Sequence, residues 1–219
     1  MPKHYPAFLN LQHRRCIVVG GGSVAQAKAQ SLVECGANVT IISPTLTDTL
    51  ASAAAQGTMQ WMRRPYQAGD LAEAFLVIAA TDDRDVNQQV ARDTRAIGVM
   101  ANVVDDPANC DFIAPAVVQR GDLTVAISTG GKSPAMARKV REHLEASLPA
   151  VYEHLLETVS EVRQTIRKDG APVAADIWQA AISPAIIDMV EAGNIQEAKD
   201  QLLRTIRGDV QPSIVREIQ

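Results

Sequence analysis

Short apolar runs alternate with helix-length stretches along the first half of the chain. Residues 15–20 form a β-branched apolar run, and residues 23–35 form a helical stretch that ends before Gly36. A second apolar run, residues 38–43, follows at once, so this helix connects two buried strands in the manner of a parallel βαβ unit. The same alternation predicts strands at about 58–62, 75–80 and 98–104, with helices at about 45–55 and 83–96. Because these strands are continuously apolar, we predict an α/β domain whose parallel sheet is covered on both faces.

The pattern changes after Pro107. Residues 112–119 and 123–128 have strand character and are separated by Arg120-Gly121-Asp122, which is typical of a β-hairpin. From Ser133 the chain is mostly helix-forming, and its breakers are Pro149, Gly170-Ala171-Pro172, Ser183-Pro184 and Gly193. We therefore expect three parts, which are the α/β domain over residues 1–113, a small strand-containing unit over 114–147 and a helical C-terminal domain over 148–219.

The first strand is followed by a glycine-rich turn. Gly20-Gly21-Gly22-Ser23-Val24-Ala25 fits the G-x-G-x-x-[GA] fingerprint and stands between a strand and a helix, as that fingerprint requires. The helix N-terminus that follows offers free N–H groups and a positive dipole to an anion. A glycine-rich turn that binds nothing is the alternative. The turn predicts a Rossmann-like domain that binds a dinucleotide, and its candidate contacts are Gly20, Gly22, Ser23 and Val24.

The end of the second strand lacks the acidic residue that usually holds the ribose. It reads Ile42-Ser43-Pro44-Thr45, and the nearest carboxylate is Asp48. No arginine stands there to favour a 2′-phosphate, so NAD is expected rather than NADP. Two later strands end at the same edge of the sheet, where open α/β folds bind ligands. The candidate cofactor contacts at these strand ends are Ser43, Pro44, Thr45, Thr81 and Asn102.

Composition narrows the classes of function. Hydrophobic residues make up 47% of the 219 residues and charged residues 21%, as in globular proteins. The 21 Lys+Arg against 25 Asp+Glu give a net charge of -4, which disfavours a nucleic-acid partner. No apolar run approaches the ~18 residues of a membrane span, and the N-terminal segment lacks a signal-peptide core, so we expect no membrane partner and a cytoplasmic location.

The residues that could bind metal are scattered. Cys16, Cys35 and Cys110 form no CxxC pair, and the four histidines form no pair with metal-ligand spacing. We expect free thiols and no protein metal ligand.

Several motifs occur together in an order that resembles one family. They are the glycine turn, Ala79-Ala80-Thr81-Asp82-Asp83, Asn102-Val103-Val104-Asp105-Asp106-Pro107 and Ser128-Thr129-Gly130-Gly131-Lys132-Ser133-Pro134. In these motifs the chain resembles the precorrin-2 dehydrogenase/sirohydrochlorin ferrochelatase family, which includes the N-terminal half of bacterial siroheme synthase. The resemblance is strong over residues 4–150 and looser beyond. Because the remaining length leaves no room for a methyltransferase domain, we expect the free-standing form, which receives precorrin-2 from a separate enzyme.

The resemblance implies NAD-dependent oxidation of precorrin-2 to sirohydrochlorin, followed in many members by Fe(II) insertion to give siroheme. It also implies a homodimer and maps the family's catalytic carboxylate to Asp105. Dehydrogenation releases a hydride to the nicotinamide and a proton to a base, and metal insertion needs acceptors for two pyrrole protons. The alternative is that Asp105 and Asp106 only form a polar turn before Pro107. Asp106 would point away from its neighbour and is the weaker candidate.

Precorrin-2 is a polycarboxylate, so its binding surface should offer cations or free N–H groups. Ser133 is the expected N-cap of a helix with Pro134 in its first turn, and Arg138 and Arg141 lie three apart on one face. A capped helix with solvated basic residues is the alternative. The candidate substrate contacts are Ser128, Thr129, Gly130, Lys132, Ser133, Arg138 and Arg141.

The sequence is also compatible with two other functions. One is a dehydrogenase that works beside a separate chelatase. The other is a regulatory module that senses NAD and contacts a partner protein through its helical part, which leaves the 128–134 turn without a role.

Overall fold

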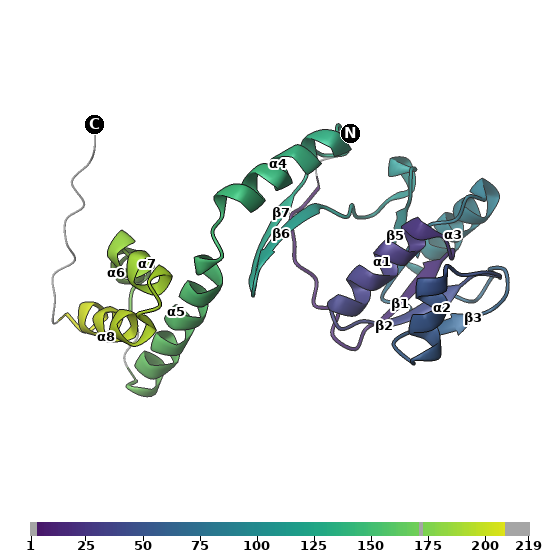
Figure 1. The fold of residues 1–219 in the computed structure, drawn as a ribbon. Helices are drawn as coiled ribbons and strands as arrows, with labels where there is room; N and C mark the ends of the chain where they lie inside the picture. The colour runs from purple at the N-terminus through teal and green to yellow at the C-terminus, as the bar shows by residue number, and fades with distance from the viewer. Residues whose placement is uncertain (1–3, 171–172, 209–219) are drawn as a thin grey trace. The chain divides into compact units, whose positions relative to one another are not determined.

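The computed structural model describes residues 4–170 and 173–208, which fall into two compact units (Figure 1). Among the described residues, the first unit comprises residues 4–114 and Gly130–Lys132, and the second comprises Pro115–Thr129, 133–170 and 173–208. Of the predicted breakers, Ala171 and Pro172 lie outside the described residues, as does the predicted helical domain beyond residue 208. The three-part division with borders at 113 and 147 stays a prediction.

A parallel sheet forms the centre of the first unit. Its strands are β1 (Arg15–Val19), β2 (Asn38–Ile42), β3 (Gln60–Met62), β4 (Leu76–Ala79) and β5 (Met100–Val103). They pair in the order β3-β2-β1-β4-β5, and every pair is parallel. This confirms the predicted Rossmann-like sheet. The order reverses beside β1, which makes the ends of β1 and β4 the topological switch point where open α/β sheets bind ligands.

Helices cover both faces of this sheet, because successive strand residues point to opposite sides. Helices α1 (Ser23–Glu34) and α2 (Asp48–Ala55) pack on one face, and α3 (Arg84–Ile97) packs on the other. Along β1, Val18 belongs to the core with α1 and α2, whereas Ile17 and Val19 belong to the core with α3. The strand ends beyond these two cores are therefore left to form a site.

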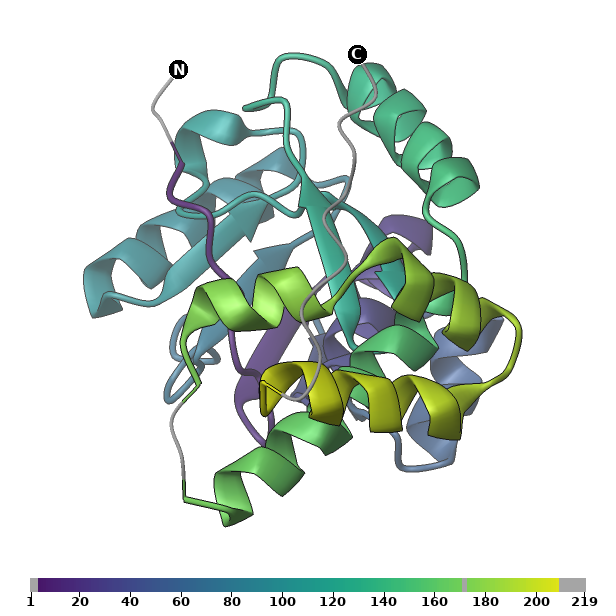
Figure 2. The ribbon, with the colours of Figure 1, turned by 90° about the vertical axis from the view of Figure 1, so that its left-hand side faces the viewer.

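The second unit contains a hairpin followed by helices. Strands β6 (Ala116–Arg120) and β7 (Leu123–Ile127) are antiparallel, with Arg120 opposite Leu123. The helices are α4 (Pro134–Ser147), α5 (Val151–Lys168), α6 (Ala175–Ala181), α7 (Pro184–Glu191) and α8 (Ile195–Ile206). Figure 2 shows α6 to α8, in yellow-green and yellow, gathered beside α5, with which they share one apolar core. No helix in the described parts combines the length and hydropathy needed to cross a lipid bilayer.

The hairpin differs from its prediction at two points. Arg120 continues β6, so only Gly121 and Asp122 form the turn. Residues 112–115 lie outside the strand, because the preceding residue binds the first unit's sheet: Asp111 exchanges N–H···O bonds with Ala101, through its own N–H and its carboxylate. We call residues 116–147, which form β6, β7 and α4, the hairpin arm.

Candidate functional site

The glycine turn joins the ends of three strands. Gly20 has φ +126°, and a Cβ there would overlap the carbonyl oxygen of Ala80 at the end of β4. Its N–H donates to Ile42 O of β2 at 3.0 Å. Only glycine fits this conformation and this close approach. The turn thus fixes the ends of β1, β2 and β4 against one another.

The next residue binds the segment that follows β2. Gly21 O accepts from the N–H of Thr47 at 3.0 Å, and a Cβ on Gly21 would overlap Thr45 O. Ser43 is buried, and its hydroxyl donates to Thr45 O at 2.7 Å. Ser43 therefore holds this turn in shape, whereas Thr45 is exposed.

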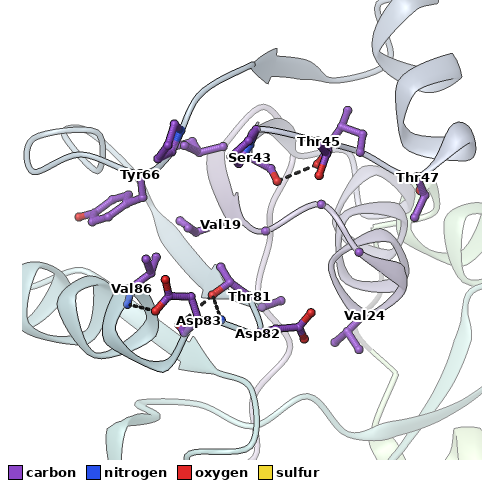
Figure 3. A pocket seen from close by; sticks show the side chains of 18 of the residues that line it. Val19, Val24, Ser43, Thr45, Thr47, Tyr66, Thr81, Asp82, Asp83 and Val86 are labelled. Atoms are coloured by element: carbon purple, nitrogen blue, oxygen red, sulfur yellow. Dashed lines mark hydrogen bonds between the residues drawn. The ribbon is translucent and has the colours of Figure 1, made fainter.

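A cavity of about 660 Å³ opens above these strand ends, within the size range of cofactor sites. In Figure 3, Ser43, Thr45 and Thr47 lie on one side of it and Thr81, Asp82 and Asp83 on the other. The predicted contacts that line it are Gly20, Gly22, Ser23, Val24, Ser43, Pro44, Thr45 and Thr81.

The cavity has the features that a dinucleotide needs. A Cβ added to Gly22 would meet nothing within 4 Å, so space is left open where a pyrophosphate would approach the backbone. Gly22 caps α1 without a side-chain hydrogen bond, which leaves the first N–H groups of the helix for a ligand. No lysine or arginine lines the cavity among the residues that the structure describes. The residues present fit a dinucleotide without a 2′-phosphate.

Sequence reasoning missed the wall that follows β3. Pro65 and Tyr66 line the cavity, and the Tyr66 hydroxyl donates to Asp93 of α3 at 2.6 Å. Burial and this hydrogen bond raise the pKa of Tyr66, so it stays a neutral donor. The sequence pattern could have indicated these residues, because the strand predicted at 58–62 is parallel to its neighbours and must end at the same edge of the sheet.

Beyond β4 the chain is held by the Asn87 side chain and by the Thr81 hydroxyl, which donates to Asp83 O and accepts from Asp83 N. The Asn87 amide of α3 donates to Thr81 O at 2.9 Å, and its Oδ1 accepts from Thr81 N at 3.3 Å and Thr81 Oγ1 at 3.2 Å. Asp83 caps α3 by accepting from the N–H groups of Asp85 and Val86. Thr81 thus faces the cavity in a fixed conformation.

A second cavity of about 480 Å³ lies at the ends of β4 and β5. Asp105 lines it and is exposed, with φ +61°. Asp106 N donates to Val103 O at 3.1 Å, which closes a tight turn around Asp105. Thr81 and Asp82 line both cavities and so form the wall between them.

The residues beside Asp105 have structural contacts. Asp106 Oδ2 accepts from the Asn109 amide at 2.7 Å, at the start of the short 3₁₀ helix Pro107–Asn109. Asn102 is buried on β5 and lines neither cavity. Its amide donates to Phe112 O at 2.9 Å. Asp106 thus lines the same cavity as Asp105 but has its carboxylate bonded to Asn109, whereas Asn102 lies outside both cavities.

The 128–134 turn leads into α4 as predicted. Ser133 is the N-cap and accepts from Met136 N at 3.1 Å, with Pro134 in the first turn. The Thr129 hydroxyl accepts from Ser133 N and donates to Ser133 O, and so closes the turn. Arg141 forms an ion pair with Glu145 at 3.4 Å, and Arg138 is exposed. Arg138 is therefore the more available of the two guanidinium groups.

Metal-binding residues are not gathered together. Within residues 4–170 and 173–208, no three His, Cys, Asp or Glu side chains form a group that could hold a metal ion. Cys16 is a free thiol in the core, and burial raises its pKa to about 11.

Two family models match consecutive parts of the chain. Residues 7–116, half of the chain, match the model described as "Putative NAD(P)-binding". Residues 120–147 match the model of the central part of sirohaem biosynthesis proteins. The first match confirms the predicted nicotinamide dinucleotide cofactor of the first unit.

Curated relatives and a solved structure agree with these matches. The chain is 36% identical over 205 residues to a siroheme synthase from Methylobacillus flagellatus, covering 93% of this chain and 44% of the relative. It is 37% identical over 207 residues to one from Pseudomonas putida, covering 94% and 45%. The chain thus spans about half the length of these relatives. The structure of SirC, a precorrin-2 dehydrogenase, has the same fold, with a TM-score of 0.73 at 24% identity over 91% of this chain and 98% of that one.

Proposed function

Because this chain belongs to the precorrin-2 dehydrogenase/sirohydrochlorin ferrochelatase family, we propose that it oxidises precorrin-2 to sirohydrochlorin with NAD. The main support for this proposal is the position of the two cavities relative to each other. The cavity that fits a dinucleotide shares its Thr81–Asp82 wall with the cavity that contains Asp105. A hydride acceptor and a proton acceptor can therefore work on one substrate from adjoining spaces.

The chain's own residues have separate roles in this reaction. Bound NAD supplies the hydride acceptor. The α1 N-terminus and Gly22 bind its pyrophosphate. The Thr45 hydroxyl hydrogen-bonds to the ribose, in place of the acidic residue that does so in other Rossmann-like domains. Asp105 accepts the proton that leaves the substrate.

We further propose that the hairpin arm binds the carboxylates of the tetrapyrrole. The α4 N-terminus and the cations Lys132, Arg138 and Arg141 supply complementary charge. The arm also supports the proposed homodimer, since Val118 is its only buried residue and Val117 and Met136 are 40% and 57% exposed. A two-stranded hairpin with so little buried surface is marginal alone, and a second copy would cover it.

The test is anaerobic incubation of the protein with precorrin-2 and NAD, following NADH and sirohydrochlorin together by absorbance. Equal amounts of both products are expected. Binding of NAD without formation of either product would refute the dehydrogenase and favour the sensing module.

We also propose that the protein inserts Fe(II) into sirohydrochlorin. Two pyrrole N–H groups lose their protons as the metal enters, so Asp105 accepts one of these protons and solvent water takes the other. Sirohydrochlorin and Fe(II) are incubated with and without the protein. Insertion no faster than in the protein-free control would leave a dehydrogenase that depends on a separate chelatase.

A further inference from the structure

The segment Ala80–Asp82 lies between two sets of functional residues. On one side the Ala80 carbonyl touches the position where Gly20 would carry a Cβ. On the other side Thr81 and Asp82 line the cavity of Asp105. The position of this segment therefore sets the separation between the two cavities.

The sheet does not hold this segment beyond its first residue. Ala80 N donates to Val19 O at 2.8 Å, which is the last bond of the β1–β4 ladder. The N–H and C=O of Thr81 both bind the Asn87 side chain instead. Asn87 is 8% exposed and lies on the first turn of α3, six residues further along the chain.

We propose that Asn87 is a positioning residue that fixes the wall between the two cavities and thereby sets the geometry of hydride transfer. The inference rests on the proposed dehydrogenase function. Asn87 also lines the cavity of Asp105, and it acts on the reaction through the Thr81 peptide groups that its side chain holds. An error of ~1 Å in such a position can lower a rate about 100-fold.

The variant N87L keeps the size of the side chain and removes all three contacts with Thr81. Its matched control is T94V, because Thr94 is a buried polar residue of the same helix whose hydroxyl donates to Val90 O and Ala91 O within that helix. We expect N87L to lower kcat for NADH formation about 10- to 100-fold and to change the Kd for NAD less than about threefold. T94V should keep the wild-type kcat.

Amide hydrogen exchange supplies a readout that is independent of turnover. In N87L without substrate, the Thr81 amide should exchange at least about tenfold faster than in wild type, because its acceptor is gone. In T94V it should exchange at the wild-type rate. If N87L does not fold, N87D replaces it, since a carboxylate still accepts from Thr81 N but cannot donate to Thr81 O.

The outcomes separate this inference from the function it rests on. If wild type forms NADH but N87L and T94V share one kcat, or if Thr81 exchange is unchanged in N87L, the positioning role is refuted and the dehydrogenase stands. If wild type forms no NADH from precorrin-2, the proposed function fails, and the positioning role fails with it.

Discussion

At the scale of single residues, the backbone of Asp105 limits how its role can be tested. Asp105 has φ +61°, a left-handed conformation that asparagine and aspartate tolerate better than other non-glycine residues. D105N should therefore fold and bind NAD like wild type. It should lose at least about 100-fold in kcat, the usual contribution of a general base. NADH formation and NAD titration on the same sample measure both properties.

D106N is the control for that variant. Asp106 bonds to Asn109 within its own turn, so its loss should affect stability more than turnover. Normal turnover in D105N would remove Asp105 from the mechanism.

Arg138 tests the tetrapyrrole surface at the same scale. A charge-assisted hydrogen bond contributes about 1.5–3 kcal/mol, so R138A should weaken precorrin-2 binding at least about tenfold while the Kd for NAD stays unchanged. Lys139 is the matched control, because its side chain is 81% exposed and pairs with Glu142 of the same helix. Equal loss of both ligands, or of neither, in binding titrations would contradict the assignment.

At the scale of elements, two glycines of one turn should respond in opposite ways. G22A places a methyl group in open space at an ordinary φ of -83°, so it should fold normally and bind NAD at least about tenfold more weakly. G20A meets the Ala80 carbonyl at φ +126° and should lower the free energy of unfolding by ~2 kcal/mol or more. Urea unfolding and NAD titration of both variants check this. If G22A binds NAD as tightly as wild type, the pyrophosphate does not bind at this turn.

The segment between β3 and β4 contains an ion pair that makes stability depend on pH. Arg64 binds Asp70 through two contacts of 2.6 and 2.8 Å, and this lowers the pKa of Asp70 below its usual value. A carboxyl whose pKa is lower in the folded state stabilises the fold above its unfolded pKa of ~3.9 and loses this effect as pH falls through the folded pKa. D70N should therefore be less stable than wild type at neutral pH, and the difference should shrink below about pH 4.

Urea unfolding at several pH values measures that difference. D122N, at the exposed hairpin turn, is the control and should follow wild type throughout. A difference between D70N and wild type that does not change with pH would show that the charge of Asp70 has no part in it.

Elements set by local pattern were predictable, and contacts set by loop geometry were not. The apolar runs and the Gly20–Ala25 fingerprint predicted the sheet and its cofactor edge, because the patterns are periodic. The Ser133 cap was also predicted. Asn87 was missed, since its partner Thr81 lies six residues away across a loop whose course no pattern gives. Asn102 looked like a strand-end ligand, but its amide turns to Phe112 O.

At the scale of the whole molecule, the exposure of the hairpin arm leads us to expect that two copies of the chain associate. Helix α4 has no buried residue, although Arg120 ties the hairpin to its C-terminal end through Glu145 O and Leu148 O. The arm is thus braced by polar bonds, while its apolar side chains other than Val118 stay partly or fully exposed, which is typical of a surface that pairs with another chain.

The exposed apolar residues of the arm predict a dimer, and a negative charge introduced among them should dissociate it. V117E and M136E each place a carboxylate among exposed apolar residues of the arm, so both should shift the mass in light scattering from dimer to monomer at micromolar concentration. I97E is the control, because Ile97 is 53% exposed on α3 of the first unit. All three should bind NAD, since the cavity of the first unit contains none of these residues. A wild-type monomer, or dimers in both arm variants, would mean that the arm's apolar surface has another partner.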